Sequence, residues 1–183
     1  MELIDPRQLL VKVANVLDNL SIPYVVTGGM AVTIWGRVRF TADIDMVIGL
    51  KTNDINTLAS ELLKLSEFGY VDRDAMREAL ANQGEFNFIE GDSGIKVDFW
   101  VKPDFPELNR RVAKDILGQR VYFVSPEDLI LSKLRWYKIS PSSRHIEDIE
   151  SILKISGEII DKDYLLEQSR KQETWDELNK LLN

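Results

Sequence analysis

Apolar residues recur every three or four positions in several parts of the chain, which is the spacing of helices with one buried face. The clearest case is residues 6–20, where Asp5 is the expected N-cap and Pro6 takes the first helical position. The same spacing predicts four more helices before residue 125, over residues 30–36, 53–65, 73–82 and around 105–114.

Short apolar runs bounded by turn residues predict strands between these helices. They cover residues 24–27, 43–48, 85–89, 95–101 and 119–124. From Pro126 the pattern is helical, over residues 126–138, about 143–155 and two short pieces after Lys162. The sequence therefore predicts an α/β core domain over residues 1–124 and a helical C-terminal portion, residues 125–183, packed on it.

Composition narrows the chemistry that the chain can perform. The 183 residues include no cysteine and one histidine, His145, which excludes disulfides, thiolate chemistry and sites with several histidine ligands. No apolar run is long enough to span a bilayer, and the first residues lack the pattern of a secretory signal. We therefore expect a cytoplasmic protein that makes no membrane contact.

The charge distribution leaves the class of macromolecular partner open. The formal net charge of −7 argues against a surface coated with nucleic-acid-binding groups. Residues 100–145 depart from that balance, with nine Lys and Arg against five Asp and Glu, whereas the tail is acidic. Solvated helix faces explain such a stretch as well as a binding patch does.

Three acidic residues stand within predicted strands. Asp43 and Asp45 are two positions apart, so their side chains project from the same face of the strand. Like charges placed side by side are unfavourable unless a cation lies between them, although a solvated sheet edge would tolerate the pair. Asp98 lies in a later strand, where it could join that pair or simply pair with Lys96.

Strand-borne carboxylates that converge would suit magnesium, which proteins hold with a few carboxylates and substrate phosphates. Two such ions about 4 Å apart can clamp the attacking and leaving oxygens of a phosphoryl transfer. Gly28 and Gly29 end the first strand and open a helix, where bare N–H groups and the helix dipole can receive a phosphate. Taken alone, a Gly-Gly pair is more often an ordinary turn.

The order of these features resembles the motif of the nucleotidyltransferase superfamily, in Thr27-Gly28-Gly29 and in Gly36-Arg37-Val38-Arg39-Phe40-Thr41-Ala42-Asp43-Ile44-Asp45. The second segment is similar to the branch that contains AbiEii-type abortive-infection toxins. Residues 125–133 and 144–149 match a lysine-bearing helix and an Arg-x-x-(Asp/Glu)-Asp helix of that branch. The resemblance covers most of residues 20–155 and implies a nucleotidyltransferase fold, a mixed β-sheet flanked by helices with a helical C-terminal portion.

The resemblance also implies roles for the residues that match. Gly28 and Gly29 would contact the triphosphate, and Asp43 and Asp45 would ligate Mg²⁺, with Mn²⁺ as the alternative. Asp98 would be the third carboxylate and would assist deprotonation of the acceptor hydroxyl.

The basic residues of the motif would bind the nucleotide. Lys133 would neutralise phosphate charge, Asp148 would orient that lysine, and Arg39 would contact the triphosphate. Arg37 and Thr41 are accessory candidates. One or both arginines could equally pair with Asp43 and Asp45 when no nucleotide is bound.

The remaining candidates favour structural roles. His145 is expected to be solvated or locally hydrogen-bonded, and Trp35 is expected in the core. Trp100, Trp136 and Tyr137 could stack on a base but fit core positions better.

Two functions remain open at this point. The first is a nucleotidyltransferase that moves an NMP from an NTP, ATP among them, to a hydroxyl on RNA or protein, as the toxin of a toxin–antitoxin pair. The second is a catalytically silent member of the fold that binds a nucleotide or a partner such as an antitoxin. The sequence leaves the NTP, the acceptor and the oligomeric state undetermined.

Overall fold

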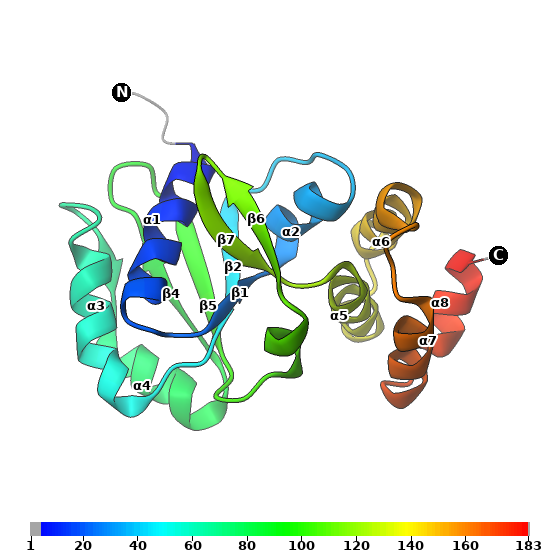
Figure 1. The fold of residues 1–183 in the computed structure, drawn as a ribbon. Helices are drawn as coiled ribbons and strands as arrows, with labels where there is room; N and C mark the ends of the chain where they lie inside the picture. The colour runs from blue at the N-terminus through cyan, green and yellow to red at the C-terminus, as the bar shows by residue number, and fades with distance from the viewer. Residues whose placement is uncertain (1–4, 183) are drawn as a thin grey trace. The chain divides into compact units, whose positions relative to one another are not determined.

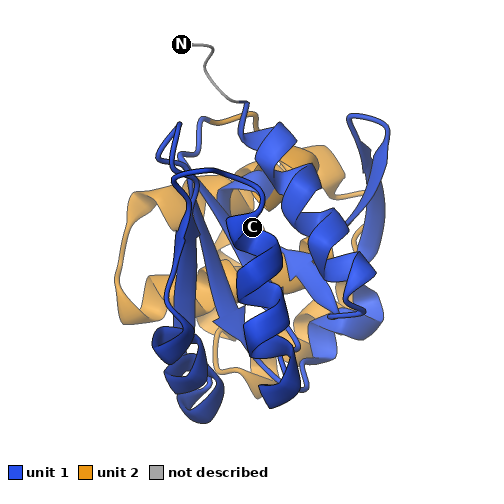
Figure 2. Cartoon of the chain, turned by 90° about the vertical axis from the view of Figure 1, so that its left-hand side faces the viewer, with its two compact units in different colours: residues 1–30, 40–123 blue, residues 31–39, 124–183 orange. Residues whose placement is uncertain are grey.

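A computed structural model describes residues 5–182. Within them the chain forms a seven-stranded mixed sheet and eight α-helices (Figure 1), which confirms the predicted α/β class. The chain divides into two compact units, coloured separately in Figure 2. Unit 1 comprises residues 1–30 and 40–123, and unit 2 comprises residues 31–39 and 124–183. Residues 31–39 therefore group with the C-terminal helices.

Unit 1 contains the whole sheet. Its strands are β1 (Tyr24–Val26), β2 (Asp43–Ile48), β3 (Tyr70–Val71), β4 (Glu85–Ile89), β5 (Lys96–Val101), β6 (Val112–Ile116) and β7 (Gln119–Phe123). They lie in the order β3-β4-β5-β2-β1-β7-β6. The pairs β2–β5 and β1–β7 are parallel, whereas the other neighbours are antiparallel. The two central strands β2 and β5 are thus neighbours although about fifty residues separate them in the sequence.

Helices α1 (Pro6–Asn19), α3 (Ile55–Leu63) and α4 (Arg73–Asn82) lie on one side of the sheet (Figures 1 and 2). Asp5 caps α1 by accepting a hydrogen bond from the Arg7 backbone N–H at 2.9 Å, as the sequence predicted. Alternate residues of β2 and β5 are fully buried, among them Ile44, Met46 and Phe99. These two strands therefore have one face in the core and one half-buried face.

The helix predicted around residues 105–114 is wrong. A short 3₁₀ helix, Pro106–Arg110, is followed directly by strand β6. Val112, Lys114 and Ile116 alternate along β6, which pairs with β7. The turn residues Leu117 and Gly118 between the two strands both have positive φ. The tight hairpin supplies partners that a local helical spacing cannot reveal.

Two smaller differences concern the start of a helix and a missed strand. Helix α2 spans Gly28–Trp35 and so begins two residues before the predicted start. The two-residue strand β3, Tyr70–Val71, was not predicted, because its length is too short to show an alternating pattern.

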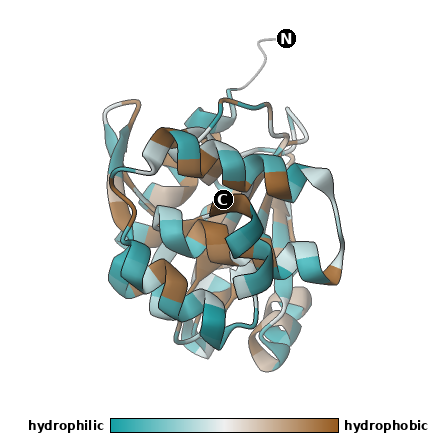
Figure 3. Cartoon of the chain, turned by 90° about the vertical axis from the view of Figure 1, so that its right-hand side faces the viewer, coloured by the Kyte–Doolittle hydropathy of each residue, from teal (hydrophilic) through white to brown (hydrophobic). Residues whose placement is uncertain are grey.

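Unit 2 consists of helices α5 (Pro126–Ile139), α6 (Ser143–Ser156), α7 (Lys162–Lys171) and α8 (Trp175–Leu182), with the end of α2 and the residues that follow it. Figure 3 shows hydrophobic and hydrophilic positions alternating along its helices, as expected for amphipathic segments. Trp35 is buried and donates its indole N–H to the Val124 carbonyl at 2.9 Å, which confirms its core position. Across residues 5–182, every helix is too short or too polar to cross a bilayer.

Candidate functional site: an acid row and a buried carboxylate

The three predicted acids lie on one face of the unit 1 sheet, and we call Asp43, Asp45 and Asp98 the acid row. β2 and β5 run parallel with Asp45 directly opposite Asp98. Directly opposed residues of neighbouring strands project to the same side, at a strand spacing of about 4.8 Å. All three acids lie on the half-buried face, because the residues between them point into the core. The structure therefore brings the predicted carboxylates to one surface.

The first glycine of the motif lies against the second acid. Gly28 has φ of +60°, and a Cβ placed on it would lie 1.8 Å from Oδ2 of Asp45. The backbone of Thr27 donates its N–H to the Asp45 carbonyl at 2.9 Å, which joins the end of β1 to β2. A side chain at position 28 would therefore collide with the carboxylate, so glycine is required both by conformation and by space.

The third acid is held by a lysine. Lys96 is two residues before Asp98 on β5, and its Nζ lies 3.0 Å from Oδ2 of Asp98. This contact is one of the two alternatives that the sequence left open, and it coexists with the placement of Asp98 beside Asp45. Among residues 5–182, no three Asp, Glu or His side chains are arranged as a ready metal site.

The donor set of the acid row nevertheless fits a hard divalent cation. It consists of carboxylate oxygens on two adjacent strands, next to a bare glycine backbone that a Cβ would fill. Oxygen ligands of this kind suit Mg²⁺ and Mn²⁺. Thr41 steadies the start of β2, because its hydroxyl donates to the Asp43 carbonyl at 3.0 Å. Asp43, Asp45 and Asp98 are thus the residues that could hold such an ion.

Unit 2 contains a second charge cluster, built around Asp148 of α6, which is fully buried. Its carboxylate accepts from Lys133 Nζ at 2.9 Å and from Arg39 Nη1 at 2.9 Å. Arg37 Nη2 lies 3.3 Å from the same carboxylate and 2.8 Å from Glu147. We call these residues the Asp148 cluster. Arg37 and Arg39 therefore pair with Glu147 and Asp148 of α6, whereas the alternative drawn from the sequence gave them Asp43 and Asp45 as partners.

Tight packing holds the loop that carries the two arginines. The Arg37 backbone N–H donates to Ser151 Oγ at 3.2 Å, and Ser156 Oγ donates to the Trp35 carbonyl at 2.5 Å. A Cβ on Gly36 would lie 2.5 Å from Ser151 Oγ. The glycine of the Gly-x-x-Arg motif thus lets residues 36–39 lie close to α6.

Electrostatics inside the Asp148 cluster favour the charged carboxylate. Burial raises the pKa of Asp148, but the hydrogen bond and charge of Lys133, followed by the charge of Arg39, outweigh burial and hold the pKa below its usual value. Buried nitrogens remain without a hydrogen-bond partner nearby: Nε of Arg37, Nε of Arg39 and Nδ1 of His145. Unpaired buried donors are costly, and the Nε–H groups of Arg37 and Arg39 are donors that an additional acceptor would satisfy.

His145 was expected to be solvated or locally bonded; the residue is half-buried, and its Nδ1 is buried without a hydrogen-bond partner. Burial lowers the pKa of His145, and the charge of Lys133 lowers it further. Both effects favour the neutral form of the ring. Sequence reasoning had no signal for this, because the burial depends on the packing of α6. Trp136 is 44% exposed, so it is not a core residue.

Unit 2 also has an open hollow of about 740 Å³ between α6, α7 and α8. Its lining is mostly apolar and includes Leu153, Leu166 and Leu181. None of the predicted site residues lines this hollow. The chemistry-bearing residues are those of the acid row and the Asp148 cluster.

Comparison with protein families gives a match over nearly the whole chain. The family model described as "Nucleotidyl transferase AbiEii toxin, Type IV TA system" matches residues 9–181. No curated protein matches the sequence. The family match includes every residue of the acid row and of the Asp148 cluster.

Solved structures of low sequence identity share the fold. ANT(2″)-Ia in complex with adenylyl-2″-tobramycin is 18% identical with a TM-score of 0.61, covering 92% of this chain and 98% of that one. A putative nucleotidyltransferase from H. pylori is 17% identical with a TM-score of 0.54, covering 97% and 78%. An antigenic nucleotidyltransferase-like protein from Paracoccidioides brasiliensis is 24% identical with a TM-score of 0.54, covering 81% and 75%. These matches confirm the predicted nucleotidyltransferase fold.

Proposed function

Because this chain belongs to the nucleotidyl transferase AbiEii toxin family, we propose that it is a magnesium-dependent nucleotidyltransferase. It would move an NMP from an NTP, ATP among the candidates, to a hydroxyl on RNA or protein. The observation that carries the proposal is the register of β2 and β5, which sets Asp45 beside Asp98 and next to Gly28. An acidic surface against a bare glycine backbone suits a metal-bound triphosphate.

Each site residue of unit 1 would have a distinct role in the reaction. Asp43 and Asp45 would hold Mg²⁺ or Mn²⁺, and the backbone N–H groups at Gly28 and Gly29 would donate to phosphate oxygens. The bound ion would supply electrostatic stabilisation of the charge that develops on the transferring phosphoryl group. Asp98 would accept the proton of the acceptor hydroxyl as its oxygen bonds to the α-phosphorus and the bond to pyrophosphate breaks.

The residues of unit 2 would bind an anion. The Asp148 cluster has three cationic side chains against Asp148 and Glu147, and the Nε atoms of Arg37 and Arg39 lack partners. On this proposal the anion is a phosphate group of the NTP substrate. Lys133 and Arg39 would be the principal donors, with Asp148 keeping both side chains in place.

The family description also supports a place in a toxin–antitoxin pair, with an antitoxin as the partner. On this proposal the transferase activity is the toxic activity. Expression of the chain alone would arrest growth, and the Asp45→Asn variant would remove the arrest while leaving the amount of protein unchanged.

The direct test is transfer of label from α-³²P-labelled NTPs. The purified protein is incubated with each NTP, Mg²⁺, and either total RNA or candidate proteins. We expect label on one acceptor class, release of pyrophosphate and loss of both with Asp43→Asn or Asp45→Asn. Asp104→Asn is the matched control, because Asp104 is an exposed acid of the same unit.

A catalytically silent member of the fold would give another result. It would bind Mg-NTP in calorimetry and transfer label to no acceptor. That outcome contradicts the transferase proposal and leaves nucleotide binding as the function. If Asp45→Asn retains full transfer activity, the assignment of the acid row is wrong.

A further inference from the structure

One cation, Lys96, lies on the same sheet face as the acid row and has no role in the proposed reaction. It is the first residue of β5 and shares the half-buried face with Asp98. Its register partner on β2 is Asp43, and its partner on β4 is Ile89. Lys96 therefore lies beside two acids of the row, opposite Asp43 and two residues before Asp98.

The contacts of Lys96 differ from those of an incidental surface pair. Its Nζ lies 3.0 Å from Asp98 Oδ2, and the Asp98 side chain is only 16% exposed. The lysine thus has Asp98 as its ion-pair partner and Asp43 as its register partner on β2.

Charge balance indicates what the lysine does. Three carboxylates on adjacent strand positions repel one another, and one ammonium group offsets part of that repulsion. A divalent cation at the row would take the Asp98 carboxylate as a ligand, and Lys96 already contacts that carboxylate through Oδ2. The lysine and the metal ion are therefore competitors for one ligand.

We propose that Lys96 is a positioning residue that holds Asp98 toward the acid row when no divalent cation is bound and yields Asp98 to that cation when it arrives. This inference rests on the proposed metal-dependent function. It predicts that Lys96 lowers the affinity of the row for metal alone and stabilises the metal-free protein. In this way the lysine keeps the row folded without metal and limits metal binding before substrate is present.

The test is titration of the full chain with Mn²⁺ alone. The electron paramagnetic resonance signal of free Mn²⁺ measures how much of the ion is bound. We expect Lys96→Met to bind Mn²⁺ about two- to five-fold more tightly than the natural protein, the range of a partly exposed ion pair. Lys96→Arg keeps the ion pair and should bind no more tightly than the natural protein. In thermal unfolding without metal, Lys96→Met should have a lower Tm, and added Mn²⁺ should raise its Tm by more than that of the natural protein.

Lys64→Met is the matched control. Lys64 is an ion-paired lysine of the same unit, 2.6 Å from Glu61 on α3, and its loss makes the same change in net charge. It should leave Mn²⁺ affinity unchanged. Lys96→Gln provides a second, polar replacement in case the methionine variant folds poorly by circular dichroism.

The outcomes separate the two proposals. If the natural protein binds Mn²⁺ and neither Lys96→Met nor Lys96→Gln binds it more tightly, the role of Lys96 is wrong while the metal site stands. A lower Tm without any gain in Mn²⁺ affinity would mean that the lysine is only structural. If neither the natural protein nor the variants bind Mn²⁺, the metal site of the proposed function is wrong, and the inference fails with it.

Discussion

In unit 1, the three carboxylates of the acid row share one sheet face with the partly exposed Lys96. In unit 2, by contrast, two arginines and a lysine contact one fully buried carboxylate, that of Asp148. The first arrangement has an excess of negative charge at a half-buried surface. The second has an excess of positive charge around a desolvated group. The same residue types are thus used in opposite proportions.

The difference decides whether a substitution acts first on ligand binding or first on stability. Exposed or half-buried like charges lower stability modestly, and a ligand of opposite charge removes the repulsion. A buried carboxylate that loses its charge leaves its cationic partners uncompensated, which is costly. Substitutions in the acid row should therefore act first on ligand binding and activity, while substitution of Asp148 should act first on folding.

The largest expected effect is on activity in the acid row. Asp45→Asn should lower nucleotidyl transfer by about 10³-fold or more, because a neutral amide cannot replace a carboxylate ligand beside the glycine backbone. Thermal unfolding should show a Tm equal to or above that of the natural protein, since one repelling charge is removed.

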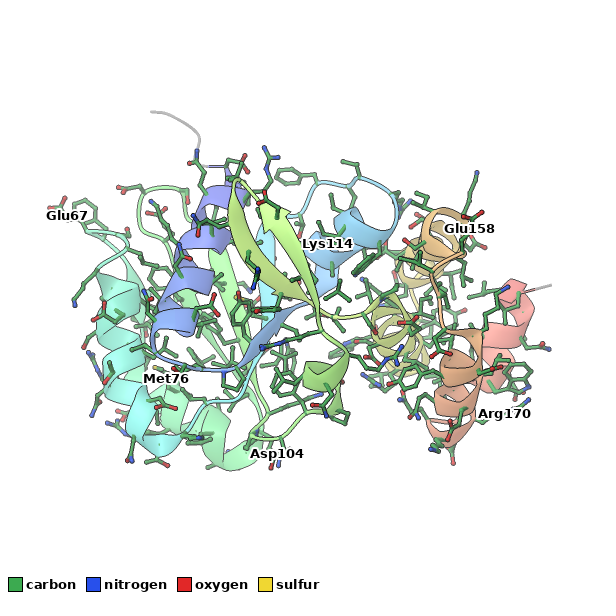
Figure 4. All side chains as sticks on the ribbon, viewed as in Figure 1. Glu67, Met76, Asp104, Lys114, Glu158 and Arg170 are labelled. Atoms are coloured by element: carbon green, nitrogen blue, oxygen red, sulfur yellow. The ribbon has the colours of Figure 1, made fainter. Side chains whose placement is uncertain are left out.

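Asp104→Asn serves as the control for this change. Asp104, labelled in Figure 4, is an exposed acid of the same unit and should have no effect on transfer. A large fall in the Tm of Asp45→Asn would contradict the expectation that this substitution acts first on ligand binding and activity.

Next is the buried carboxylate of unit 2. Asp148→Asn keeps the side-chain volume but removes the charge that Lys133 and Arg39 contact, and it should lower the free energy of unfolding by about 3–5 kcal/mol at pH 7. Urea denaturation at pH 7 measures the loss. The exposed acid Asp163 of α7 provides the control, since Asp163→Asn should change stability by less than about 0.5 kcal/mol. Equal stability of Asp148→Asn and the natural protein would show that the cluster does not hold the fold.

A smaller effect is expected at the glycine that touches the acid row. Gly28→Ala should lower the free energy of unfolding by about 1–3 kcal/mol and weaken Mn²⁺ binding, because it combines positive φ with a collision against Asp45. Gly118→Ala isolates the backbone contribution, since Gly118 also has positive φ, +81°, but a Cβ there meets nothing within 4 Å. Equal losses of stability in the two variants, with unchanged Mn²⁺ binding, would show that the close approach of Gly28 to Asp45 is unimportant.

The smallest effect on stability is expected at Glu90, a buried acid of unit 1 whose carboxylate is held by hydrogen bonds from Ser93. Burial raises the pKa of Glu90, but the side chain and backbone N–H of Ser93 donate to it and lower the pKa to about 2. Because this pKa is below the ordinary value of 4.5, the ionised group contributes stability that is complete above about pH 4.5 and is lost as the pH falls toward about 2.

Glu90→Gln should therefore lower the free energy of unfolding by about 1 kcal/mol at pH 7. The difference from the natural protein should shrink as the pH falls from 4.5 toward 2. Urea denaturation at pH 7, 4.5 and 3 measures it. A difference that stays constant over these pH values would mean that the charge of Glu90 is not what stabilises the turn.

Local patterns predicted most elements of both units. The strand over residues 43–48 and the helix over residues 73–82 have the predicted bounds, because alternation and amphipathic spacing are local properties. The segment 105–114 was mistaken for a helix, since its strand depends on pairing with β7. The sequence raised the contacts of Lys96 with Asp98 and of Lys133 with Asp148 as possibilities, and the structure has both. The contacts of Arg37 and Arg39 with Asp148 were not predicted.

The sequence by itself determined that Asp43 and Asp45 share a face, that glycines begin α2, and that the chain carries the motif of its family. Only the tertiary structure decided that Asp98 lies opposite Asp45, that Lys96 holds it, and that Arg37 and Arg39 contact Asp148. Side-chain direction along a strand follows from backbone geometry, so one strand suffices to predict it. The choice and register of a distant neighbour depend on the packing of the whole core, which no local period encodes.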